Sequence, residues 1–216
     1  SVLAAVDRAA TGPRTLVAHE HGAVGPSKDC AYEGPVLKAI TGCPISMEGK
    51  SSSCAHFSPL GNIAAAAADL WSNESVPYAQ LFGGYTPEVM LEQLWYDCKL
   101  MNTALEAGQG RMVRDLLAES DIHRSAEALV LAPASVIRIA RAIVSAEGYA
   151  ARAHAAAREA LTIIEEALAA KTFEVPELEL PWLNAIKAGL DEYAGLDGKL
   201  VDHYLAAHGA GVIPAE

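Results

Sequence analysis

The chain has 216 residues, of which 51% are hydrophobic, and its formal net charge at neutral pH is −11. This length suffices for one sizeable hydrophobic core, yet no apolar run approaches the roughly 20 residues that span a bilayer. The acidic balance, with a pI near 5.1, disfavours a phosphate-binding surface. We therefore expect a soluble protein that partners neither nucleic acid nor membrane.

The N-terminal segment and the cysteines indicate a cytoplasmic protein. Residues 1–8 have no basic region and no cleavage pattern of a signal peptide, and we interpret them as the end of a helix that began upstream. Cys30, Cys43, Cys54 and Cys98 have neither zinc-finger nor CxxC spacing. A chain of this size with half its residues apolar does not require disulfides, so reduced thiols are expected.

Short β-prone segments alternate with helical ones in the first half of the chain. We predict three strands, at residues 15–19 after the turn at Gly12 and Pro13, at residues 44–48, and at residues 78–82 before Gly83. Residues 62–71 predict an alanine-rich helix. This alternation is typical of parallel strands with crossover helices, so the sequence predicts an α/β sheet or barrel.

A longer helix is predicted to follow the third strand. Thr86 provides an N-cap, Pro87 a proline at the first helical position and Glu88 an acid in the first turn. The apolar residues recur at spacings of three and four, which predicts one buried stripe. Its members are Leu91, Leu94, Trp95, Cys98, Met101 and Leu105.

Downstream of Gly110 the pattern is helical throughout. Helices are predicted at residues 111–117, 135–146, 149–170 and 182–193, with Pro176 and Pro181 interrupting the run. No catalytic pattern occurs there, so we interpret this half as an outer helical layer or a subunit contact. The predicted domains are residues 1–108, with the β/α units, and residues 109–216, a helical extension.

The segment of residues 16–35 concentrates the groups that could perform chemistry. It begins as an apolar strand and continues into a glycine-rich loop that contains Glu20, Cys30 and Glu33. In parallel α/β folds ligands bind beyond the carboxyl ends of the strands, and zinc is held by Cys, His and carboxylate groups. Cys30 is the candidate metal ligand, although a lone cysteine in a loop is more often a small buried hydrophobe.

The other cysteines and the glycines are weaker candidates for a functional site. Cys98 and Cys43 are interpreted as core residues. Cys54, which lies near His56, could be either structural or functional. The glycines at 61, 83 and 84 follow neither nucleotide-binding motif, so no nucleotide site is predicted.

Several blocks of the chain resemble one enzyme family. They are residues 22–33 with the run Lys-Asp-Cys-Ala-Tyr-Glu, residues 38–42, residues 47–50 with 54–56, residues 71–76, and residues 96–98 with 100–106. In order and spacing they are similar to the zinc-containing subunit of methanol:corrinoid methyltransferases. The resemblance is specific from about Thr15 to Ile122 and looser through the C-terminal helices.

The resemblance implies a fold and a metal site. It implies the C-terminal part of a TIM (β/α)8 barrel, about three β/α units followed by an all-helical layer. Zinc would be bound by one glutamate and two cysteines, and Cys30 matches the cysteine of the Lys-Asp-Cys block. The other two ligands belong to strands that the family places upstream, so we read the chain as the C-terminal half of a longer protein.

The resemblance also implies an activity and its partners. Zinc would polarise the oxygen of methanol, and the cobalt(I) corrinoid of a small partner protein would take the methyl group. Glu20 and Glu33 are candidates for a hydrogen bond to the metal ligands or for accepting the hydroxyl proton. A homo-oligomer through the helical layer is expected. Two alternatives are a related methyltransferase for another small methyl donor and a non-catalytic interaction fragment.

Overall fold

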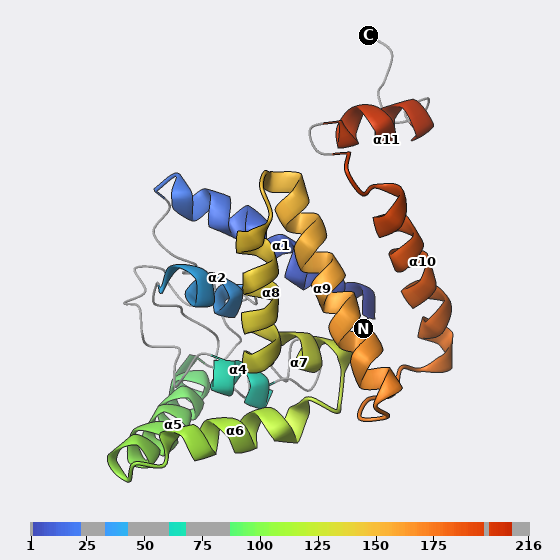
Figure 1. Ribbon diagram of the computed structural model, residues 1–216. Coiled ribbons are helices and arrows are strands. Elements are labelled where there is room, and N and C mark those ends of the chain that lie inside the picture. The colour runs from blue at the N-terminus through green and yellow to red at the C-terminus, as the bar shows by residue number, and fades with distance from the viewer. Residues whose placement is uncertain (1, 23–32, 43–60, 68–86, 197–198, 209–216) are drawn as a thin grey trace.

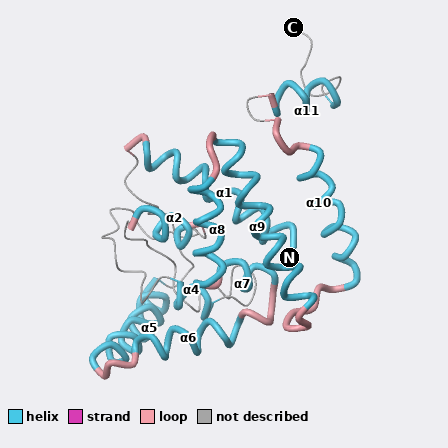
Figure 2. Tube along the Cα trace, in the orientation of Figure 1, coloured by secondary structure: helices cyan, strands magenta, loops and turns pink. Residues whose placement is uncertain are grey.

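A computed structural model describes residues 2–22, 33–42, 61–67, 87–196 and 199–208 (Figure 1). The regular elements of these residues are all helical, as Figure 2 shows. In chain order they are α1 (Val2–Glu20), α2 (Gly34–Thr41), α4 (Gly61–Ala67), α5 (Pro87–Glu106), α6 (Gly110–Asp121), α7 (Ala126–Leu131), α8 (Pro133–Ser145), α9 (Tyr149–Ala169), the short 3-10 helix η1 (Glu177–Glu179), α10 (Leu180–Glu192) and α11 (Leu200–His208).

The described residues do not form the predicted α/β barrel. Residues 15–19, predicted as a strand, lie in the last turns of α1, and Gly12 and Pro13, predicted as a turn, lie within the same helix. No strand occurs in the ranges given above. The prediction of a TIM-barrel segment is therefore wrong for this part of the chain. The strands predicted at residues 44–48 and 78–82 lie outside the described residues.

α1 is helical because its buried residues recur at helical spacing. Val2, Ala5, Val6, Ala9 and Leu16 are buried, and the intervals between them place these side chains on one face. Pro13 has no N–H to offer the preceding turn, but it is buried within the helix. Burial of the apolar face thus outweighs the lost backbone hydrogen bond, and the helix continues to Glu20.

The helices predicted after residue 86 are confirmed with small shifts at their ends. α5, α6, α8, α9 and α10 correspond to the five predicted segments. Ser125 begins α7, which the sequence did not reveal, by accepting a hydrogen bond from the backbone N–H of Ala128 at 3.1 Å. Pro133 stands in the first turn of α8, where proline is tolerated.

One hydrophobic core contains residues from α1 to α10. α9 packs along α1 and α8, while α2 and α7 close the sides and α10 runs back along α9 (Figure 1). The α9 face is largely alanine, including Ala156, Ala157 and Ala160, which allows neighbouring helices to approach closely. α5 and α6 form a hairpin at one end of the core, attached through α4.

The α5 stripe is less buried than its spacing predicts. Met101 is buried, but Cys98 is only half-buried, and Trp95 and Leu105 are more than half exposed. Cys98 is therefore not a core residue of the described part.

None of the helices within the described ranges has the length and apolar character needed to cross a bilayer.

Candidate functional site

Glu20 lies at the C-terminal end of α1, on the surface. Its Oε1 accepts a hydrogen bond from Nη1 of Arg152, near the start of α9, at 3.2 Å. Both side chains are at least one quarter exposed, so this ion pair contributes at most about 1 kcal/mol. The pair fixes the end of α1 against α9, and the carboxylate of Glu20 is engaged with a guanidinium.

Glu33 lies at the opposite end of the segment that follows α1. It precedes α2 as its N-cap residue, in a helical backbone conformation and without a side-chain capping bond. Its Oε1 instead accepts a hydrogen bond from the hydroxyl of Thr15 on α1, at 3.0 Å. The structure thus places Glu20 and Glu33 at two points along the last turns of α1, each with its own partner.

Cys30 lies outside the described residues, within the segment that these two carboxylates bracket. In the ranges that the structure describes, no three His, Cys, Asp or Glu residues come together as a metal site. The ligand role of Cys30 therefore stays a prediction. Cys98, on α5, forms no disulfide with another described residue.

A cavity beside α9 was not predicted from the sequence. It has a volume of about 350 Å³ and lies between α9, the end of α10 and Ala10 of α1. Alanines of α9 form one wall, and Leu190, Tyr193 and Leu196 form the other. The only sequence signal is an alanine-rich helix with one histidine, which also fits ordinary close helix packing.

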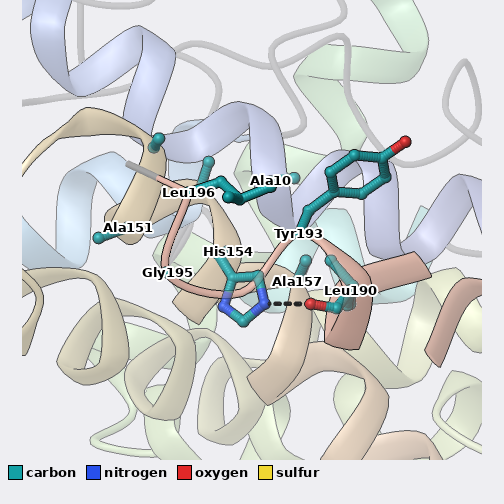
Figure 3. Close-up of a pocket in the computed structure, with 10 residues that line it drawn as sticks. Ala10, Ala151, His154, Ala157, Leu190, Tyr193, Gly195 and Leu196 are labelled. Carbon is teal, nitrogen blue, oxygen red and sulfur yellow. Dashed lines mark hydrogen bonds between the residues drawn. The ribbon is translucent and has the colours of Figure 1, made fainter. Parts of the chain in front are cut away.

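His154 contributes a hydrogen-bonding side chain to the lining of this cavity. Its Nε2 donates to the carbonyl oxygen of Leu190 at 2.7 Å. Because a carbonyl can only accept, Nε2 carries a proton. Figure 3 shows the hydroxyl of Tyr193 directed away from His154. The cavity is thus apolar, with no pair of groups placed for acid–base chemistry.

Asp121 is a buried carboxylate that stabilises the start of α4. It is 2% exposed, and it accepts hydrogen bonds from the backbone N–H groups of Asn62 and Ile63, at 2.9 and 3.3 Å. These donors begin α4 and have no partner within that helix. Asp121 therefore caps α4 from the end of α6.

Three comparisons relate the chain to known proteins. Residues 1–212 match the family described as the methanol-cobalamin methyltransferase B subunit. A methanol–corrinoid protein co-methyltransferase of Methanosarcina barkeri strain Fusaro is 44% identical over 207 residues, which cover 95% of this chain and 45% of the relative.

A solved structure agrees with the sequence relationship. The crystal structure of the methanol:cobalamin methyltransferase complex MtaBC from Methanosarcina barkeri contains a chain that is 43% identical and superposes with a TM-score of 0.83. The match covers 98% of this chain and 46% of that one. The chain therefore spans about half the length of the relatives it matches. The resemblance drawn from the sequence blocks is confirmed.

Proposed function

Because this chain belongs to the methanol-cobalamin methyltransferase B subunit family, we propose that it forms part of an enzyme that transfers the methyl group of methanol to a corrinoid. The supporting observation is the family match over residues 1–212, together with 44% identity over 95% of the chain. A corrinoid-carrying protein is the proposed partner, as the solved relative is a methanol:cobalamin methyltransferase complex.

We further propose that the enzyme is zinc-dependent and that Cys30 is one of the zinc ligands. Zinc, when bound, would act as a Lewis acid on the oxygen of methanol. Glu20 and Glu33 are engaged with Arg152 and Thr15, and the described residues hold no three-ligand group. As the resemblance implies, the remaining ligands would come from the part of the family fold that this chain does not span.

The two carboxylates act, in this proposal, by positioning the segment that carries Cys30. Glu20, at the end of α1, pairs with Arg152, and Glu33 accepts a hydrogen bond from Thr15 of the same helix. A metal ligand that is held in position before binding loses less conformational entropy when the metal binds. This role is an alternative to accepting the hydroxyl proton of methanol.

A homo-oligomer through the helical layer is also proposed. Large apolar side chains stand out from this layer: Leu178 is 88% exposed and Trp182 is 63% exposed. Exposed aromatic residues such as Trp182 are enriched at protein–protein contacts. Sedimentation of the purified chain tests this proposal, and a monomer at high concentration would contradict it.

Methyl transfer is tested with the chain co-assembled with the remaining portion of the Methanosarcina barkeri relative. The assay follows loss of the cobalt(I) absorption of a corrinoid protein on addition of methanol. We expect Cys30→Ala to reduce both zinc content and the transfer rate, because one of three protein ligands is lost. Cys98→Ala is the matched control and should retain both.

The outcomes separate the alternatives. Full zinc content and full activity in Cys30→Ala would contradict the ligand assignment. Methylation from other small methyl donors, but not from methanol, would favour a related methyltransferase. Absence of both zinc and transfer in the assembled protein would favour a non-catalytic role.

A further inference from the structure

A groove between α2 and α8 combines an apolar lining with an arginine. Ala39 and Ile40 of α2 form one side, and Ile137, Ala140, Arg141 and Val144 of α8 form the other, around a volume of about 250 Å³. Ile137 and Val144 are 48% and 57% exposed. These two residues are about 10 Å apart along the helix axis, which is the length of two turns of a helix lying in the groove.

α8 is apolar on more than one face. Val136, Ile139 and Ile143 are buried against the core, whereas Ile137, Arg141 and Val144 follow at intervals of four and three on the adjacent face. A helix on the surface of a complete protein usually has a single apolar stripe and polar residues elsewhere. A second apolar strip indicates that another element covers this side of α8.

Arg141 differs from the other arginines of α8 and α9. Arg138 binds the carboxylates of Glu159 and Glu166 at 2.7 and 2.6 Å, Arg152 binds Glu20, and Arg158 binds Asp191. For Arg141, which is exposed, the described part of the chain provides no carboxylate. A guanidinium beside an apolar groove would select an occupant with an acidic side chain.

We propose that the α2–α8 groove receives an amphipathic helix, with an acidic residue facing Arg141, from the portion of the family fold that this chain does not span. In the solved relative this chain corresponds to 46% of one polypeptide, so the two portions of that polypeptide must meet at some surface. The groove fits helix-in-groove recognition, in which apolar residues at helical spacing enter a hydrophobic groove.

A second copy of the chain is the less favoured occupant. In a single polypeptide the two portions are held together at high effective concentration, whereas contact with a second copy requires association of two separate molecules. The inference depends on family membership and on the groove. It does not depend on methyl transfer, zinc or corrinoid.

The test is a binding experiment without substrate, metal or corrinoid. The chain is co-expressed with the unmatched portion of the Methanosarcina barkeri relative, and the dissociation constant of the purified pair is measured. Arg141→Glu and Val144→Asp should each weaken binding by about tenfold or more. The matched controls, Arg111→Glu and Met112→Asp on α6, replace an exposed arginine and a 53% exposed methionine and should change binding less than about twofold.

Circular dichroism and thermal unfolding of each variant verify that it is folded. Hydrogen exchange gives a second measurement: in the wild-type pair, protection should increase at residues 36–40 and 137–144. No complex with the wild-type chain, equal binding by all four variants, or protection confined to another surface would overturn the inference. Loss of self-association, rather than of the mixed complex, in Arg141→Glu would assign the groove to a second copy. Because no outcome involves methanol, failure here is distinct from failure of the proposed activity.

Discussion

His123 connects α6 to the turn after α9 through both of its ring nitrogens. Nδ1 lies 2.6 Å from the carbonyl oxygen of Thr172, beyond α9, and Nε2 lies 3.2 Å from Oε1 of Glu119 on α6. Both partners are acceptors, so both bonds require the protonated ring. The hydrogen bond to the Glu119 carboxylate, followed by that to the Thr172 carbonyl, raises the pKa of His123.

The raised pKa of His123 predicts a pH-dependent contribution to stability. The contribution is fully present below the unfolded pKa of about 6.5 and is lost as the pH rises through the higher pKa of the folded state. The side chain is 45% exposed, so we expect less than about 1 kcal/mol. Urea unfolding should show wild type more stable than His123→Gln at pH 5.5, with the difference shrinking by pH 8.5. A constant difference would contradict this assignment.

Asp121 should be a sensitive position because its carboxylate serves buried donors at the start of α4. Asp121→Ala leaves the N–H groups of Asn62 and Ile63 without their acceptor, and we expect a loss of about 2–3 kcal/mol in the free energy of unfolding. Asp115→Ala, an exposed aspartate on the same helix, should cost less than about 0.5 kcal/mol. Equal losses in chemical denaturation would show that Asp121 is not a cap.

At the scale of elements, Gly12 determines how closely α1 approaches α2. A Cβ placed at this position would lie 3.2 Å from Cγ1 of Val36 and 3.6 Å from Cδ1 of Ile143. Gly12→Ala should be nearly neutral, because its higher helix propensity offsets the crowding. Gly12→Leu should destabilise the protein by about 1–3 kcal/mol. Urea unfolding tests both variants, and a Gly12→Leu variant as stable as wild type would contradict the close approach.

The sequence predicted most helices but misassigned α1. Its first turns were interpreted correctly as helical, but Gly12 and Pro13 suggested a turn, and residues 15–19 then resembled a short apolar strand. Tertiary burial of Leu16 overrode this local signal. α7 was missed because six residues are too few to show a helical period.

The candidate site was predictable only in part. The sequence blocks indicated the family correctly. They could not reveal that Glu20 and Glu33 are engaged with Arg152 and Thr15, because such partners are set by tertiary packing of distant segments. The same holds for the cavity around His154, since periodicity gives the buried face of a helix but not its neighbour. The predicted boundary between two domains, at residues 108 and 109, stays a prediction.

At the scale of the whole molecule, the chain alone should not transfer a methyl group from methanol. It spans 45% of its curated relative, and its described residues provide no three-ligand metal group. A single thiolate cannot hold zinc at a defined open site against water. We expect no loss of cobalt(I) absorption with the chain, zinc and a reduced corrinoid protein. Robust methylation would mean that ligands within this chain, such as His21, Cys43 or Cys54, complete the site.

The pairing of α1 with α9 has a consequence for biosynthesis. Glu20 and Arg152 are 132 positions apart, so a ribosome adding 5–20 residues per second needs roughly 7–26 s to make the second after the first. During this interval the apolar face of α1 has left the exit tunnel without its main partner. Nascent chains should therefore depend on chaperones that shield α1, and slowing translation between these two helices should increase aggregation.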